Sequence, residues 1–184
     1  MRRTFLIASA LMVASLAVGA AQGQTVMVGG QSMLPSRNIV ANAVNSQDHT
    51  TLVAAVKAAG LVETLQGAGP FTVFAPTNAA FGKLPAGTVE TLVKPESKAT
   101  LTKILTYHVV AGRLDATTLM SRIQAGKGTA ELSTVSGGKL WAMMNGPKNV
   151  VLKDEKGGVV EISTYDVMQS NGVIHVVTGV LMPN

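Results

Sequence analysis

The side chains of this sequence with the richest chemistry are three histidines, His49, His108 and His175, together with Tyr107, which directly precedes the second of them. No two of these histidines lie within four positions of each other, so the sequence has no local pair of the kind that holds a metal ion. We therefore predict no metal and no cofactor. His175 falls on an apolar strand face and is predicted to be buried, whereas His49 is expected to be exposed.

Tyr107 and His108 lie in a segment, residues 106–110, that is predicted to be a strand. Adjacent side chains on a strand point to opposite faces, so the phenol and the imidazole cannot work as a directly paired acid and base. One role for the pair is direct contact with a binding partner. We favour the other role, in which a buried His108 organises backbone hydrogen bonds.

Nucleophilic catalysis finds no support in the sequence. The chain has no cysteine, which excludes disulfides, thiolate metal sites and cysteine nucleophiles. Ser136 lacks the glycine two positions earlier that a nucleophile elbow requires. Residues 126–129 (GKGT) resemble a phosphate loop only in part, because no glycine-rich segment precedes them at the required spacing. We therefore predict a protein without enzymatic activity.

The first residues have the pattern of an export signal. Arg2 and Arg3 are followed by an uncharged apolar stretch and then by small residues suited to signal peptidase. We predict a signal peptide over residues 1–23 and export to the periplasm or the cell exterior, with an uncleaved membrane anchor as the alternative. After cleavage, no further transmembrane segment is expected.

The charge of the chain bears on the class of its partner. The chain has 15 basic and 10 acidic residues, a net charge of +5, and removal of the two leader arginines would leave 13 against 10, or +3. The remaining lysines are scattered and aromatic residues are few, so neither a phosphate-tracking surface nor a base-stacking platform is predicted. We expect no nucleic-acid partner.

The apolar pattern divides the rest of the chain. Residues 24–37 are glycine-rich and without periodicity, and are predicted to be a flexible linker to a domain over residues 38–184. The first half of that domain has the apolar spacing of helices. Asp48 is the expected N-cap of one of them and Gly60 its left-handed end.

A sharp corner is predicted where the strand-forming residues 71–75 run into Pro76, and Thr77 is the expected N-cap of the helix that follows. The second half of the chain alternates between apolar and polar residues. Besides residues 106–110, it contains predicted strands over residues 129–135, 139–144, 149–153, 159–163 and 173–177. Helices in the first half and antiparallel strands in the second predict the α+β class.

Three segments together resemble the fasciclin domain family. They are residues 71–81 (FTVFAPTNAAF), the pair Tyr107 and His108, and residues 171–183 (NGVIHVVTGVLMP), and the similarity extends from residue 38 to residue 183. Within them, the residues taken as structural motif positions are Thr77, Asn78, Asn171 and His175. The resemblance implies a wedge of two β-sheets with helices packed on one side.

The resemblance also implies an exported adhesion or protein-interaction module. Its partner would be an envelope, matrix or host-surface protein or polysaccharide. In animal members the Tyr-His region is associated with receptor binding, which makes Tyr107 and His108 the candidate binding residues. Thr178 stands where the family commonly has aspartate, and Met168 where an aromatic residue is frequent.

A carrier function is the alternative. Some fasciclin-type proteins bind pigments, so the resemblance is also compatible with an apolar small molecule held in a pocket between sheets and helices.

Overall fold

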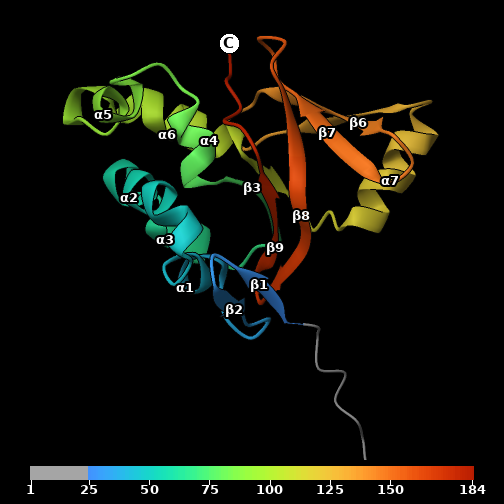
Figure 1. Cartoon of the computed structure of the whole chain (residues 1–184), viewed down its shortest axis with the longest axis horizontal. Helices are drawn as coiled ribbons and strands as arrows, with labels where there is room; N and C mark the ends of the chain where they lie inside the picture. The colour runs from blue at the N-terminus through green and yellow to red at the C-terminus, as the bar shows by residue number, and fades with distance from the viewer. Residues whose placement is uncertain (1–24) are drawn as a thin grey trace, which may run out of the picture.

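The computed structural model describes residues 25–184, and its main body is a seven-stranded sheet with helices packed against it (Figure 1). The signal peptide predicted over residues 1–23 lies outside the described residues. The strands follow the spatial order β4-β3-β9-β8-β7-β6-β5. Their bounds are β3 Phe71–Pro76, β4 Val109–Ala111, β5 Thr129–Ser133, β6 Lys139–Asn145, β7 Asn149–Lys153, β8 Val159–Gln169 and β9 Gly172–Val177.

Two segments that lie far apart in the chain meet at the centre of this sheet. β3 pairs in parallel with β9, in a register that places Phe74 opposite His175. The other strand pairs of the sheet are antiparallel. At the start of β9 the two backbones approach so closely that a Cβ on Gly172 would collide with the Phe71 carbonyl oxygen. This contact requires glycine.

The sheet curls back on itself to give the wedge that the family resemblance implies. β8 has irregular register against β9 between Ile162 and Thr164 and again between Thr164 and Val167, and irregularities of this kind bend a strand. At the other end, an isolated bridge between Val110 and Thr134 brings β4 to the end of β5 and nearly closes the sheet. The α+β fold class is confirmed.

Alternate residues of the central strands fill two separate hydrophobic clusters. Val73 and Ile174 belong to the first, which lies between the sheet and the helices, whereas Phe74 and Val177 belong to the second, inside the curled sheet. This division follows from the two-residue period of a strand. Both central strands are therefore almost entirely buried, which explains their nearly continuous apolar sequences.

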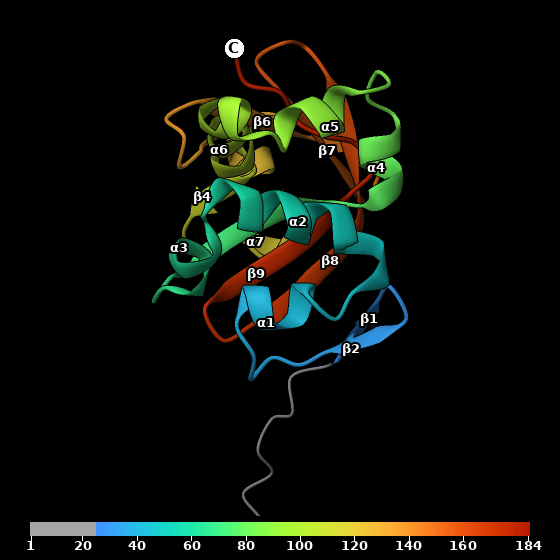
Figure 2. The same ribbon diagram turned by 90° about the vertical axis from the view of Figure 1, so that its left-hand side faces the viewer.

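Most helices cover one side of the sheet, as Figures 1 and 2 show. Their bounds are α1 Ile39–Ala43, η1 Gln47–His49, α2 Thr50–Ala59, α3 Val62–Gln66, α4 Asn78–Gly82, α5 Thr88–Leu92, η2 Pro95–Ser97 and α6 Lys98–Tyr107. The exception is α7 Ala116–Ala125, which packs against β5 and β6 at the other end of the molecule. Between residues 25 and 184, no helix is long and apolar enough to span a membrane.

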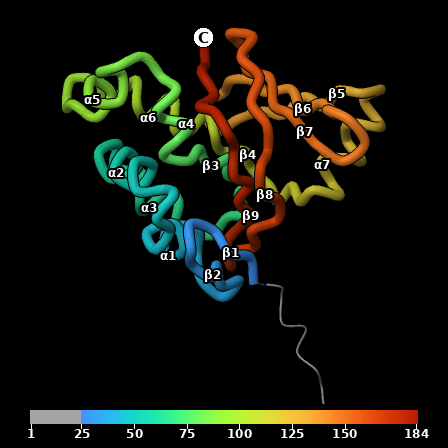
Figure 3. Tube along the Cα trace, viewed as in Figure 1, coloured from blue at the N-terminus to red at the C-terminus, as the bar shows by residue number. Residues whose placement is uncertain are grey.

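The N-terminal hairpin replaces most of the flexible linker predicted over residues 24–37. β1 Val26–Val28 pairs antiparallel with β2 Gln31–Met33, beside α1 and β8 (Figure 3). Gly29 and Gly30 both have positive φ, as a type I′ two-residue hairpin turn requires. Val28 and Met33 are buried in the first cluster. For the described residues the linker prediction is wrong, because this glycine pair is a tight turn.

The strand predicted over residues 106–110 is wrong for its first three residues. The helix α6 continues to Tyr107, and only residues 109–111 are extended, as β4. The buried residues Leu101, Ile104 and Leu105 extend the apolar face of this helix to its last turn. The β-branched neighbours of Tyr107 favour a strand locally, but packing of the helix decides the outcome.

The N-terminus of α2 is capped from another part of the chain. Asp48, the predicted N-cap, lies instead within the 3₁₀ turn η1. The Asn78 side-chain oxygen accepts a hydrogen bond from the Thr51 N–H (3.0 Å), and its amide nitrogen donates to the Gln47 carbonyl (2.8 Å). Asn78 therefore joins the first turn of α4 to the start of α2.

Two other predicted helix ends are confirmed. Thr77 caps α4, and its hydroxyl accepts a hydrogen bond from the Ala80 N–H at 3.2 Å. Gly60 ends α2 with a φ of 74°, and the Leu61 N–H donates to the Val56 carbonyl at 3.0 Å, as in a Schellman ending.

Candidate functional site

Tyr107 is the last residue of α6, and its side chain is buried in the second cluster. Its hydroxyl donates to the Lys139 carbonyl (2.6 Å) and accepts from the Glu155 N–H (3.0 Å). Burial raises the pKa of Tyr107 to about 12, so the phenol is neutral at physiological pH. The ring packs so closely on Gly138 that a Cβ there would lie 2.7 Å from a ring carbon. Tyr107 thus joins α6 to the strands of the curled sheet.

His108 is the next residue, and its side chain points to the side of the sheet where the first cluster lies. There it lines the space between the sheet and the helices. Its Nδ1 lies 2.8 Å from the Ile104 carbonyl, and its Nε2 accepts a hydrogen bond from the Leu181 N–H at 2.9 Å. A carbonyl can only accept, so the proton of the neutral ring lies on Nδ1. Burial lowers the pKa of His108 to about 4. Both ring nitrogens are therefore hydrogen-bonded to backbone groups.

The same region holds the C-terminal residues. Next to the amide bound by His108, the Met182 N–H donates to Asp154 Oδ2 at 3.0 Å, and the Asn184 N–H donates to Glu155 Oε2 at 3.1 Å. Asp154 is buried, and its other oxygen accepts the N–H groups of its own turn. These interactions tie the end of the chain to the turn between β7 and β8.

His175, on the central strand β9, has no exposed surface. Its Nε2 lies 2.7 Å from the Leu114 carbonyl, and its Nδ1 accepts a hydrogen bond from the Asp166 N–H at 3.3 Å. The ring stacks on Phe74, with centroids 5.8 Å apart. Burial lowers the pKa of His175, so the ring is neutral near pH 7. Its predicted place in the core is confirmed.

Asn171 lies in the turn between β8 and β9 and connects three elements. Its side-chain oxygen accepts a hydrogen bond from the Ile39 N–H at 3.0 Å. Its amide nitrogen donates to the carbonyls of Leu65 (2.8 Å) and Gly67 (3.0 Å). The side chain therefore fastens the start of α1 and the end of α3 to the sheet.

The candidate residues named from the sequence do not converge on one site. Tyr107 and His108 enter different clusters, and His175 and Asn171 lie at other points of the sheet. Within the part of the chain that the structure describes, no group of three or more His, Cys, Asp or Glu side chains could hold a metal ion. What these motif residues share is that each binds backbone groups of a neighbouring element.

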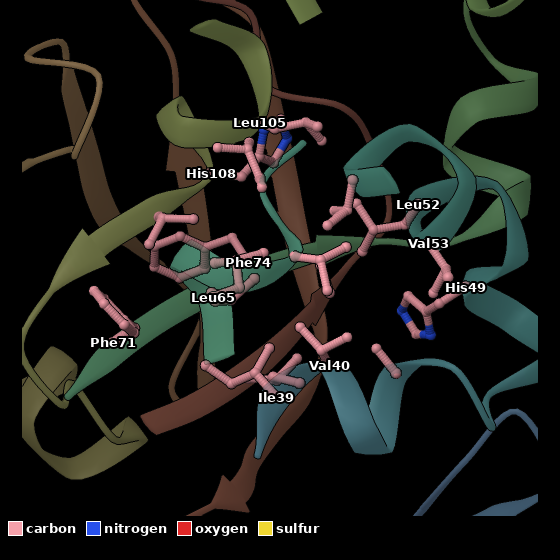
Figure 4. A pocket seen from close by; sticks show the side chains of 18 of the residues that line it. Ile39, Val40, His49, Leu52, Val53, Leu65, Phe71, Phe74, Leu105 and His108 are labelled. Atoms are coloured by element: carbon pink, nitrogen blue, oxygen red, sulfur yellow. The ribbon is translucent and has the colours of Figure 1, made fainter. Parts of the chain in front are cut away.

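A cavity of about 80 Å³ lies between the helices and the central strands (Figure 4). Its wall is almost entirely apolar and comes from the hairpin, α1, α2, α3, β3, β9 and the end of α6. Among the lining residues are Ile39, Val40, Leu52, Val56, Val73 and Ile174. His108 and His49 are the two imidazoles that border it.

His49 is 3% exposed, so the prediction that it lies in solvent is wrong. The 3₁₀ turn η1 turns the ring beneath α2, where its Nδ1 lies 2.8 Å from the Ser46 hydroxyl. No group forms a hydrogen bond of normal geometry with its Nε2, although the Ala75 backbone lies close enough to the ring to raise its pKa and partly offset the effect of burial. A signal for this burial exists in the sequence, since His49, Leu52 and Val56 have the i, i+3, i+7 spacing of one helix face.

Comparison with known proteins identifies the family. Residues 47–183 match the model of the Fasciclin domain. The chain belongs to this family. It is 48% identical over 145 residues to protein sll1483 of Synechocystis sp., a match that covers 79% of this chain and 73% of that protein. It is 42% identical over 123 residues to the cell surface glycolipoprotein MPB83 of Mycobacterium bovis, covering 67% of this chain and 48% of that protein.

A solved structure has the same fold as this fasciclin domain. The FAS1 domain pair from the insect cell adhesion molecule fasciclin I matches with a TM-score of 0.71 at 17% identity. The match covers 81% of this chain and 52% of that chain, so this chain spans about half of the solved pair.

The cavity of this fasciclin domain is built partly outside the family match. The matched residues begin at Gln47, so α2, β3 and β9 lie within them. The hairpin and α1, which supply Val28, Met33, Ile39 and Val40 to the cavity wall, precede them. His49 lies at the junction of the two parts.

Proposed function

We propose that this fasciclin domain is an exported binding module that acts by contact with a protein or polysaccharide and has no catalytic activity. The observation that carries the proposal is that His108 and His175 have every ring nitrogen hydrogen-bonded to the backbone. A general base needs a nitrogen within reach of its substrate, and neither ring offers one. The motif residues therefore stabilise the fold, and a partner would bind at the surface of the domain.

Export is the second part of the proposal. It is supported by the basic and then apolar pattern of the first residues, and by the relative MPB83, whose name describes a cell surface protein. The solved FAS1 pair comes from a cell adhesion molecule. The partner that we propose is an envelope, matrix or host-surface protein or polysaccharide, met in the periplasm or outside the cell.

Tyr107 and His108 enter this proposal as scaffold residues. Because both side chains are buried, a partner would contact the surface that they hold in place and not the two rings themselves. Substitutions at either position would then weaken binding only as far as they weaken the fold.

Export is tested by cell fractionation combined with intact-mass measurement of the recovered protein. We expect the protein in the envelope or medium, shortened by about the length of the predicted leader. A control with Arg2→Glu and Arg3→Glu, which removes the basic start of the leader, should stay inside at full length. Recovery of the unaltered chain from the cytoplasm at full length would contradict the proposed export.

A carrier function is the second candidate, and the apolar cavity is the observation that favours it. Native mass spectrometry of protein purified from its own host tests it. A carrier should retain a bound small molecule under gentle ionisation, and a bare polypeptide mass would count against this function.

A further inference from the structure

His49 is a buried polar residue whose hydrogen bonds are incomplete. Its Nδ1 pairs with the Ser46 hydroxyl, and its Nε2 is the one buried side-chain nitrogen or oxygen without a partner among the described residues. Leaving such a group unpaired costs about 1–3 kcal/mol, so unpaired groups in native proteins call for an explanation. In either tautomer, Nε2 keeps one free function: it is a donor if Ser46 donates to Nδ1 and an acceptor if Nδ1 donates to Ser46.

The apolar cavity lies directly against this ring. His49 is among its lining residues and lies where α1 and α2 meet, across the cavity from His108 (Figure 4). The ring nitrogens of His108 are both occupied, and so is the Thr106 hydroxyl, which donates to the Thr102 carbonyl at 2.7 Å. The buried Ser46 hydroxyl also lines the cavity but is bonded to Nδ1 of His49, so Nε2 is the buried polar atom of the lining that has no hydrogen bond of its own.

The face of α2 gives the cavity its direction. His49, at the N-cap position of α2, and Val53 and Lys57 within the helix line it at intervals of four residues, and Lys57 is exposed. Eight residues of helix span about 12 Å at about 1.5 Å per residue. The lining therefore extends from a buried polar atom at one end to a solvent-exposed ammonium at the other, with an aliphatic wall between them.

The chemistry of an occupant follows from these surroundings. A carboxylate bound at His49 would be a buried ion without a countercharge, because its surroundings are aliphatic and the Lys57 ammonium is exposed at the other end of this face. Burial lowers the pKa of His49, which keeps the ring neutral and removes a cationic partner as well. A hydroxyl group fits either tautomer, since it both donates and accepts.

The volume restricts the size of the occupant. Pockets for drug-sized ligands measure about 300–1,000 Å³, and a cavity of about 150 Å³ holds benzene. The cavity here, at about 80 Å³, is too small for a pigment and favours a narrow aliphatic chain, the outer part of which would lie along the lining toward the exposed Lys57.

We propose that this cavity binds a small neutral straight-chain alcohol, whose alkyl chain lies along the aliphatic wall of α2 and whose hydroxyl hydrogen-bonds Nε2 of His49. This goes beyond the binding-module proposal, because it names a ligand class and a contact residue and needs no protein partner.

Titration of the protein with 1-butanol, 1-hexanol and 1-octanol, followed by amide and histidine side-chain ¹⁵N NMR, tests the proposal. We expect saturable shifts in α1, α2 and β3 together with a shift of the His49 Nε2 resonance. Affinity should rise roughly fourfold per methylene until the cavity is filled. Absence of saturable shifts up to the solubility limit would overturn the proposal, as would an ordered water on Nε2 that the alcohols do not displace.

Two substitutions of His49 distinguish the contribution of the Nε2 hydrogen bond to alcohol binding from that of the apolar cavity wall. An asparagine amide can replace Nδ1 toward Ser46 but does not reach the position of Nε2, whereas a glutamine amide can reach it. His49→Asn should weaken 1-hexanol binding about 3–10-fold, and His49→Gln should retain most of it. Since the shorter asparagine leaves more space for the alkyl chain, the loss cannot come from crowding. Equal binding by both variants and the wild type would overturn the role of His49.

Unfolding curves and amide spectra of both variants, recorded without ligand, show whether each one folds. Failure of the alcohol titration leaves the binding-module proposal intact, because that proposal depends on a partner at the surface. Failure to find a surface partner equally leaves the alcohol site intact.

Discussion

His108 and His49 border the same cavity, yet their ring nitrogens are in opposite situations. Both nitrogens of His108 bind backbone groups, whereas one nitrogen of His49 is unpaired. The sequence could predict that His175 is buried, because strand alternation is a local property. It could not identify the partners of these rings: the Leu181 amide and the Leu114 carbonyl reach them from distant parts of the chain, and only the completed fold brings them close.

Acid should destabilise the protein through His108. In the unfolded chain this histidine takes up a proton near pH 6.5, but in the folded protein only near pH 4. Between these values the unfolded state binds more protons, so the free energy of unfolding falls as the pH falls and is fully restored above about 6.5. His108 should account for about 3 kcal/mol of this loss between pH 7.5 and pH 4.

Urea unfolding of the wild type and of His108→Gln at several pH values measures this contribution. The variant should be less stable at pH 7.5, and the gap should narrow toward pH 4 because glutamine takes up no proton. Parallel pH profiles for the two proteins would contradict the buried, neutral state of His108.

Removing the Tyr107 hydroxyl should cost stability by a different route. Tyr107→Phe leaves the Lys139 carbonyl and the Glu155 N–H without their shared partner, so we expect a loss of about 1–3 kcal/mol in the free energy of unfolding. Tyr165→Phe is the matched control, because that hydroxyl accepts a single hydrogen bond, from the Val150 N–H. Chemical denaturation should give a larger loss in the free energy of unfolding for Tyr107→Phe than for Tyr165→Phe. Equal losses would show that the two hydrogen bonds of Tyr107 stabilise the protein no more than the single one of Tyr165.

At the scale of elements, local patterns predicted the strands of the second half well. Residues 149–153 form β7 as predicted, and the alternation of residues 139–144 identifies β6. The end of α6 was not predictable from local preference, because Tyr107 is helical through tertiary packing. α7 was missed because only Leu119 and Ile123 of its residues are buried, too few for a clear helical period.

The cap that Asn78 provides for α2 gives a prediction for helix stability. Asn78→Ala removes the acceptor of the Thr51 N–H and should cost about 1 kcal/mol. Asn78→Asp keeps an oxygen at that position and adds favourable charge at the helix N-terminus, although it loses the donor to the Gln47 carbonyl. Thermal unfolding should place Asn78→Asp between Asn78→Ala and the wild type, and equal loss in both variants would show that the cap bond contributes little.

The parallel pairing of β3 and β9 gives a prediction with a larger effect. Gly172→Ala places a methyl group on the Phe71 carbonyl and should cost at least about 3 kcal/mol in the free energy of unfolding. Gly82→Ala is the same chemical change at the end of α4, where a Cβ would meet no atom within 4 Å, and it should be neutral or slightly stabilising. Both variants can be compared by urea denaturation. Similar stability for the two would contradict the close approach of the central strands.

At the scale of the whole molecule, the two motif strands form one structural centre. β3 and β9 pair side by side, and the polar residues around them fasten the helices, the turns and the C-terminal residues to the sheet. The periodicity of the sequence predicted the α+β class, and the fasciclin resemblance implied the wedge-shaped sheet. The resemblance also suggested a pocket between sheets and helices, but neither the residues that line it nor the N-terminal hairpin could be predicted, because both depend on how the first helices pack on a sheet formed late in the chain.

We propose that the motif residues build a scaffold and that the protein acts by binding at its surface. Quantitative photo-crosslinking to an envelope or matrix fraction tests it most directly, with the wild type compared with His108→Gln at a temperature where both give folded amide spectra. We expect both proteins to capture the same partner in similar yield, and excess unlabelled wild type to compete for it. A folded His108→Gln protein that loses the partner, or a wild type that captures none, would contradict it.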